Sequence, residues 1–191
     1  MKKLLFICLL AGLMSPACEK EKKAPVEVGE FNVEHVIAVD RQDMFMNYGE
    51  TYRWYETCIL LKEYLDSNEA SNEITGISNV FQVYRVEDEC IDTDVVMYTH
   101  TADTAIVDVK HGFWVDDFPL NEELIKVTFE EAYQKVMEVN YEKPHSRQCV
   151  IRKPIGPINC NPQYIFGNIH SQIYVDATNG NVTDKNPAFN E

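Results

Sequence analysis

The sequence predicts an α+β protein in which helices cover antiparallel sheets, built as two modules that each run helix, strand, strand, strand. Two observations support this class. A capped, amphipathic stretch near residue 128 indicates a helix, and alternating or β-branched runs on either side indicate strands. The order of elements also appears twice along the chain, although the letters do not repeat. An antiparallel sheet with a helix on one face buries such an arrangement.

The helix of the second module begins at Thr128. The run Thr128-Phe129-Glu130-Glu131 forms a capping box, in which Thr128 caps the backbone and Glu131 reaches back. Apolar residues then follow at helical spacing until about residue 140. Strands are expected at 148–152, 163–168 and 172–178. The first two are separated by a segment rich in proline, which does not fit a central strand.

The first module is expected to begin with a helix over residues 50–66. Trp54, Cys58, Leu61 and Leu65 fall along one stripe at helical spacing. Strands are expected to follow at 79–86, 95–99 and 104–115. The chain therefore divides into a first, diverged α+β module over 31–120 and a second over 121–191.

The stretch YVDATNGNVTD, residues 174–184, allows two interpretations. Its oxygen-bearing side chains suggest a calcium loop, but counting from Asp176 places Gly180 at position 5, where a ligand is required, and Pro187 at position 12. Asn179-Gly180 instead suits a type I′ turn between two strands. We therefore expect a hairpin here, and no metal ligands.

Residues 1–17 have the features of an export signal, with two lysines, an apolar run and small residues. The apolar run of about eleven residues is shorter than the roughly twenty needed to cross a bilayer. Ser15-Pro16-Ala17-Cys18 resembles a lipobox, which predicts lipidation at Cys18, with residues 18–30 as a polar tether. The alternative is ordinary signal cleavage nearby, with Cys18 an incidental thiol.

The charge of the chain restricts its partners. The net charge is −14, and removal of residues 1–17 takes away two lysines and no acid, which makes it −16. Such a chain repels nucleic acid and anionic lipid surfaces. We expect no nucleic-acid partner, and contact with the membrane through the N-terminal lipid only.

Four cysteines remain after the signal and the lipidation site, namely Cys58, Cys90, Cys149 and Cys160. An even number in an exported chain favours disulfides, and sequence spacing favours Cys149–Cys160 and Cys58–Cys90. A zinc site is the alternative, but the chain has no CxxC pair or HxxxH partner.

A search for catalytic signatures finds none. The five histidines, at 35, 100, 111, 145 and 170, are scattered and are interpreted as surface or loop residues. No HExxH, GxSxG or glycine-rich phosphate loop occurs. Residues 87–94 hold five acids, which could attract a cation or a basic peptide but are interpreted as a solvated loop. We expect no enzyme activity, no cofactor and no metal site.

Aromatic residues offer one possible partner surface. Tyr and Trp are enriched at protein interfaces. The candidates are Trp54, Tyr55, Trp114, Tyr164 and Phe166, together with Tyr141. The competing interpretation is that these side chains fill the cores of the modules.

The stretch 126–184 resembles a PepSY-type domain. The likeness rests on the helix start Thr128-x-Glu130-Glu131-Ala132 and on a closing strand with Tyr174, Val175, Asp176, Gly180 and Val182. It covers about a third of the chain, and a diverged first copy would close at 113–116. The whole chain is similar to small envelope lipoproteins with tandem PepSY-like modules, and its tandem helix-plus-sheet arrangement is similar to the beta-lactamase inhibitory protein. These resemblances imply an inhibitor or binding role toward a protease or another envelope protein.

The sequence therefore predicts an exported lipoprotein of the bacterial envelope with a binding or regulatory role and no catalysis. Its expected partner is a protein or peptide of the envelope, and pairing of an extended peptide with a sheet edge is one physical mode. A hydrolase whose active-site residues lie far apart in sequence, or a purely structural envelope component, are the alternatives.

Overall fold

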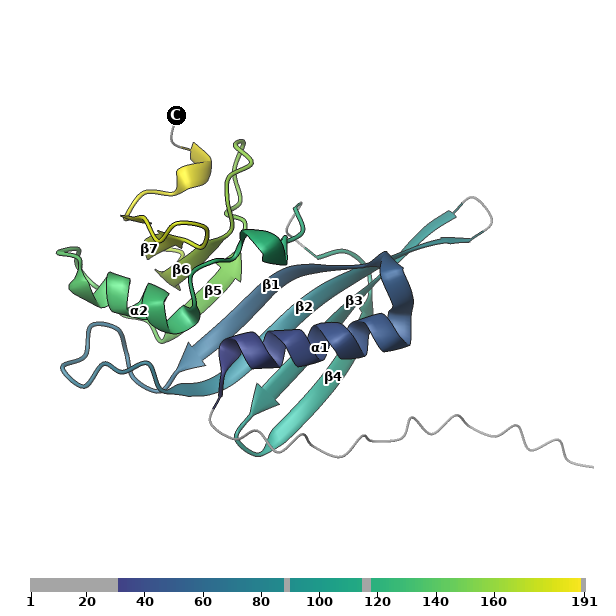
Figure 1. The fold of residues 1–191 in the computed structure, drawn as a ribbon, viewed down its shortest axis with the longest axis horizontal. Coiled ribbons are helices and arrows are strands. Elements are labelled where there is room, and N and C mark those ends of the chain that lie inside the picture. The colour runs from purple at the N-terminus through teal and green to yellow at the C-terminus, as the bar shows by residue number, and fades with distance from the viewer. Residues whose placement is uncertain (1–30, 88–89, 115–117, 190–191) are drawn as a thin grey trace, which may run out of the picture.

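A single antiparallel sheet of eight strands runs through the computed structural model (Figure 1). The structure describes residues 31–87, 90–114 and 118–189, with the backbone alone over 84–87 and 90–92. The strands are β1 (Tyr52–Leu61), β2 (Ile74–Glu87), β3 (Cys90–Thr101), β4 (Thr104–His111), β5 (Gln148–Arg152), β6 (Gln163–Asn168), β7 (Ser171–Asp176) and β8 (Val182–Thr183). Their order is β4-β3-β2-β1-β5-β6-β7-β8, so two meanders join where β1 pairs with β5.

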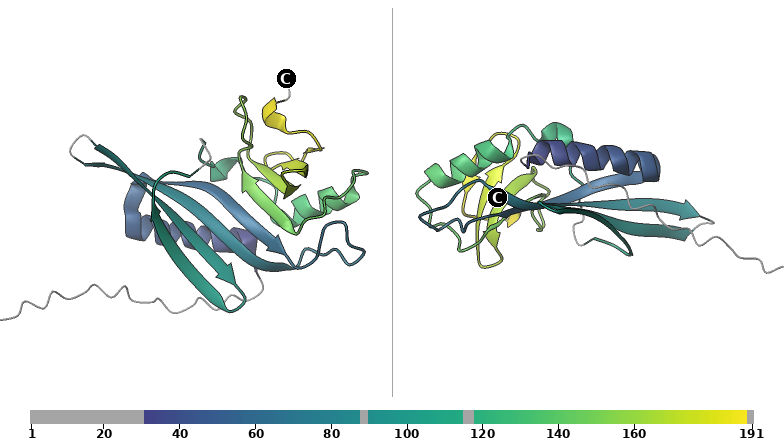
Figure 2. Two further views of the ribbon diagram at one scale, coloured as in Figure 1. Left: turned by 180° about the vertical axis from the view of Figure 1, so that it is seen from behind. Right: turned by 90° about the horizontal axis from the view of Figure 1, so that it is seen from below.

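Two α-helices of the described residues, α1 (Val33–Tyr48) and α2 (Phe129–Glu138), lie on the same face of this sheet (Figure 2). The sheet register agrees, because Ile59 pairs with Ile77 beneath α1 and with Cys149 toward α2. One hydrophobic core runs beneath both helices. Short 3-10 turns follow at Gly49–Thr51, Glu122–Leu124 and Pro187–Phe189. The α+β class with an antiparallel sheet is confirmed.

The predicted start of α2 is confirmed. The Glu131 N–H donates to Thr128 Oγ1 at 3.2 Å, and the Thr128 N–H donates to Glu131 Oε2 at 2.8 Å. The buried face of the helix carries Phe129, Ala132, Tyr133 and Val136. Phe129 stacks on Phe166 of β6 with ring centroids 6.2 Å apart, which attaches the helix to the sheet.

The helix predicted over residues 50–66 is wrong, because this segment forms β1. The four apolar residues at helical spacing suggested a helix, but the same segment also alternates as a strand does. Thr57, Ile59 and Leu61, at every second position, are buried. The β-branched and aromatic content of the segment fits a strand. The first helix instead lies earlier, as α1, where Asn32 accepts the His35 N–H at 2.8 Å as N-cap.

The predicted strands are otherwise found. The runs 148–152 and 163–168 coincide with β5 and β6, and 79–86 and 95–99 lie inside β2 and β3. The run 172–178 overlaps β7, and 104–115 shortens to β4, which ends at His111. All eight strands belong to one sheet.

The stretch 174–184 forms a hairpin between β7 and β8, as predicted, but its loop is longer than a two-residue turn. The Asp176 N–H donates to Asn181 O at 2.9 Å and the Gly180 N–H to Asp176 O at 2.7 Å, which leaves four residues in the loop. Gly180 has φ 76°, a value that favours glycine. Asp176 Oδ1 accepts the Thr178 N–H, so this carboxylate supports the turn.

Candidate functional site

A groove of about 570 Å³ lies on the sheet face opposite the helices, at the ends of β1, β2 and β3. The register places two rows of side chains across these strands. One row is Cys58, Ser78 and Thr99, and the next is Leu60, Gly76 and Thr101. These rows form the floor of the groove.

Gly76 keeps the floor low. A Cβ added there would lie 3.3 Å from His100 O and 3.9 Å from the Leu60 Cβ, so a side chain would fill the space above the strands. Ser78 Oγ and Thr99 Oγ1 are hydrogen bonded at 3.1 Å. Leu60 is 40% exposed, which makes it the apolar part of the floor that solvent reaches.

One wall of the groove comes from two segments that are distant in sequence. The backbone N–H groups of Leu61 and Leu65 donate to the carbonyls of Arg147 and Ser146, at 2.7 and 2.9 Å. These bonds bring Tyr64 against His145, where the rings stack at 4.2 Å with an interplanar angle of 5°. The Arg147 guanidinium lies 5.6 Å from the centroid of the Tyr64 ring.

His145 and Arg147 each have a further polar contact that fixes their position in the wall. His145 Nδ1 lies 3.0 Å from Asp66 Oδ2, and Arg147 donates to Lys62 O at 3.3 Å. The wall therefore presents a flat aromatic surface and one guanidinium. Such a combination of apolar surface and few polar groups is typical of binding pockets.

Cys58 lies in the groove as a protonated thiol. Burial raises its pKa above the usual value, and the hydrogen bond from Gln148 Nε2, at 3.1 Å, lowers it by less. The nearby Glu56 carboxylate raises the pKa further. A thiol nucleophile needs the opposite environment, with a lowered pKa.

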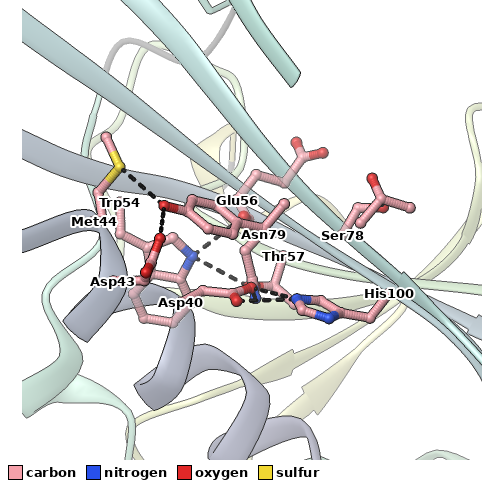
Figure 3. A network of polar contacts seen from close by, with 11 residues as sticks. Asp40, Asp43, Met44, Trp54, Glu56, Thr57, Ser78, Asn79 and His100 are labelled. Atoms are coloured by element: carbon pink, nitrogen blue, oxygen red, sulfur yellow. Dashed lines mark hydrogen bonds and ion pairs between the residues drawn. The ribbon is translucent and has the colours of Figure 1, made fainter. Parts of the chain in front are cut away.

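A network of buried polar side chains lies on the other face of the sheet, beneath α1 (Figure 3). Asp40 of α1, 2% exposed, accepts a hydrogen bond from Asn79 Nδ2 at 2.6 Å. Both Asp40 oxygens lie 2.9 Å from His100 Nε2. Asn79 Oδ1 accepts from Thr57 Oγ1 at 2.5 Å, and the Trp54 Nε1–H donates to that Thr57 oxygen at 3.1 Å. The network joins α1 to three strands.

A second contact from α1 flanks this network. The Tyr98 hydroxyl donates to Asp43 Oδ2 at 2.8 Å, one turn beyond Asp40. Burial, followed by the Asp43 carboxylate, raises the pKa of Tyr98 far above its usual value, so the hydroxyl keeps its proton. Both acids therefore serve as acceptors that hold α1 on the sheet.

The aromatic residues predicted as a partner surface do not form one. Trp54, Tyr55, Tyr164 and Phe166 are between 0 and 4% exposed, so they fill the core, as the competing interpretation held. Trp114 is half-buried, and its backbone N–H donates to Gln82 Oε1 at 2.9 Å. The prediction failed because aromatic content alone does not distinguish core from surface.

The predicted disulfide pairs are not formed. Cys58, Cys149 and Cys160 are free thiols. Cys58 lies opposite Ser78 on β2, and Cys90 lies opposite Glu87, nine residues along the same strand, or about 30 Å away. A disulfide needs Cα atoms within about 7 Å. Cys149 is buried in β5, and Cys160 lies beyond the end of the β5–β6 ladder, so spacing in sequence was a poor guide to distance.

The histidines differ from the prediction at one position. His100 is buried, whereas His35, His111, His145 and His170 are exposed. Of the acidic run 87–94, residues 88–89 and the side chains up to 92 lie outside the described residues. Within the described part of the chain, no group of three or more metal-binding side chains is found. The signal, Cys18 and the tether also lie outside it.

The fold and groove define an α+β protein with one continuous antiparallel sheet, both helices on one face and a hollow on the other. No protein-family model, curated protein or solved structure matches this chain. No helix among the described residues is long and apolar enough to span a bilayer. The groove was not predicted, because its residues come from five short segments that share no motif.

Proposed function

We propose that this chain is a non-enzymatic binding protein of the bacterial envelope, exported and lipid-anchored at Cys18, that holds a protein partner in the groove. The observation that carries the proposal is the groove itself, with an apolar floor at Leu60 and a stacked wall of Tyr64 and His145. Its volume of about 570 Å³ fits one or two large side chains of a partner segment.

The chemistry of the groove favours binding over catalysis. Its thiol, Cys58, has a raised pKa and its hydrogen bond comes from an amide. The Asp40–His100 pair, which resembles the acid and base of a hydrolase, is buried beneath α1 and bonded to Asn79. We therefore favour a binding or regulatory role over the hydrolase alternative.

The partner that suits this groove is an envelope protein that offers an uncharged, extended segment. Binding of that segment would inhibit or regulate the partner protein. The floor offers aliphatic and hydroxyl groups, and the wall offers an aromatic face. The net charge of −14 disfavours nucleic acid and acidic partners. A membrane contact is proposed only for the N-terminal lipid.

We also propose that the two halves of the chain are repeated modules. Each half runs a helix and then four antiparallel strands, α1 with β1–β4 and α2 with β5–β8. This order supports two PepSY-like modules fused through β1 and β5. The modules would be 31–120 and 121–191, and the groove lies where the two meet.

A photo-crosslinking experiment tests the proposed function. A photoreactive residue at Thr101, in the groove, is compared with one at Ser171, which is exposed at the β6–β7 turn. We expect a discrete protein adduct from position 101 in native envelopes and none from 171. Equal adducts from both positions, or none from 101, would overturn the proposal.

A matched pair of variants then tests the floor. Leu60→Glu places a carboxylate in the groove, and Ile155→Glu places one at a similarly exposed aliphatic residue elsewhere, since the two are 40% and 49% exposed. We expect Leu60→Glu to reduce the adduct from position 101 at least tenfold and Ile155→Glu to leave it unchanged. An adduct that survives Leu60→Glu would show that the partner does not use this floor.

A further inference from the structure

Arg147 is a half-buried groove residue whose guanidinium is only partly engaged within the described part of the chain. A guanidinium carries five N–H donors. One nitrogen of Arg147 donates to Lys62 O at 3.3 Å, and the described residues supply no other acceptor. The remaining nitrogens are not buried. The group is therefore fixed at one point and can donate to a ligand in the groove.

No carboxylate of the described residues forms an ion pair with Arg147. Asp66, on the segment after β1, lies 3.0 Å from His145 Nδ1. Glu73, before β2, lies 2.8 Å from Lys62 Nζ. Each of these acids thus has another partner. A carboxylate that enters the groove would meet a planar guanidinium, which can bind it through two parallel hydrogen bonds.

The floor beside the guanidinium is short and apolar. Leu60 pairs with Gly76 on one side and with Gln148 on the other, so the exposed Leu60 side chain adjoins the segment that carries Arg147. Gly76 has no side chain, which leaves room next to Leu60. The volume of about 570 Å³ holds one or two large side chains. A groove of this size suits the end of a chain better than a long internal segment.

We propose that the groove binds the C-terminus of the partner protein, with the terminal carboxylate on the Arg147 guanidinium and the last side chain over Leu60 and Gly76. This inference rests on the proposed function and names the part of the partner that enters the groove. The net charge of −14 disfavours a segment with several acidic side chains. A C-terminus brings a single carboxylate to a segment whose side chains are uncharged, and binding of terminal carboxylates is a recurring mode of peptide recognition.

Mapping of the cross-link from position 101 tests the inference on the full chain in native envelopes. Thr101 lies in the same row of the groove floor as Leu60 and Gly76. Mass spectrometry should place the adduct within about five residues of the partner's C-terminus, a length of roughly 17 Å when extended. An adduct at an internal segment of the partner would overturn this inference and leave the proposed function standing. Absence of an adduct would overturn both.

A defined peptide tests the carboxylate directly. N-acetyl-Ala-Val-Phe, whose last side chain suits the aromatic wall, is titrated into the full chain in detergent, as the free acid and as the C-terminal amide, by calorimetry. The acid should bind at least about tenfold more tightly, because the amide cannot form the charge-assisted pair. Affinities within threefold of each other, or no binding of the acid at about 10 mM, would overturn the proposal.

Variants at Arg147 separate its guanidinium from general charge. Arg147→Gln should abolish the preference for the acid, and Arg147→Lys should keep part of it, because an ammonium supplies charge without the planar fork. Lys62→Gln is the matched control, since it removes a nearby positive charge whose side chain is bonded to Glu73. It should leave the preference unchanged, and thermal unfolding checks that each variant is folded. A loss as large from Lys62→Gln as from Arg147→Gln would show that no specific guanidinium contact is made, and the proposal would fail.

Discussion

Removal of the Asp40 carboxylate should lower the stability of the fold more than most single changes in α1 and the strands beneath it. Asp40→Ala leaves Asn79 Nδ2 and His100 Nε2 without their acceptor, and these atoms lie 2.6 and 2.9 Å from it. An orphaned buried donor costs about 1–3 kcal/mol, and breaking a buried pair costs about 3–5 kcal/mol. We expect the free energy of unfolding to fall by about 3–5 kcal/mol.

A matched variant on the same helix separates this effect from loss of charge alone. Asp43→Ala removes the acceptor of Tyr98, but Asp43 is only half-buried, so we expect a loss of about 1–2 kcal/mol. Urea unfolding followed by circular dichroism measures the stability of both variants. With a slope of about 2 kcal/mol/M, the midpoint should fall by about 2 M for Asp40→Ala and by less than about 1 M for Asp43→Ala.

Two outcomes would refute the reasoning about the network. The first is an Asp40→Ala midpoint no lower than that of Asp43→Ala. The second concerns a double variant, Asp40→Leu with His100→Leu, which replaces both members of the pair by apolar groups and should recover about half of the lost stability. A double variant that is less stable than Asp40→Ala would mean that the pair itself stabilises the fold.

Three further predictions follow from local geometry. Hydrogen bonds from Thr128 lower the pKa of Glu131, so its stabilising effect is present above its ordinary pKa of 4.5 and is lost as pH falls through the lowered pKa. Thermal unfolding should therefore show that Glu131→Gln destabilises the protein more at pH 7 than at pH 2. Gly180→Ala should cost about 1–2 kcal/mol, because φ is 76° and the added Cβ meets the Lys135 side chain at 2.6 Å. The same change in a Lys135→Ala chain keeps the backbone strain and removes the contact, so an equal loss in both chains would exclude a role for the lysine. Burial raises the pKa of Cys149 well above 9.0. Iodoacetamide at pH 8 should therefore leave this thiol unmodified in the native chain and label it in urea. Rapid labelling of the native chain, measured by mass spectrometry, would contradict the burial of Cys149.

Local signals predicted the second half of the fold better than the first. The capping box at Thr128 and the strands 148–152 and 163–168 are each specified by short-range chemistry, and the structure contains them at these positions. Helix α1 gave a weaker signal because its buried face includes Asp40, a residue that pattern analysis assigns to water. Only the presence of His100 and Asn79 beneath the helix makes that burial favourable.

By itself the sequence determined the α+β class, the capped helix, most strands and the β7–β8 hairpin, because these depend on residues that are neighbours along the chain. Only the tertiary structure decided that Tyr52–Leu61 is a strand, that all strands form one sheet, and which cysteines and aromatic residues meet. It also created the groove, whose Tyr64 and His145 are 81 residues apart in sequence but stacked in space. Such contacts depend on strand pairing and burial, which no local pattern encodes.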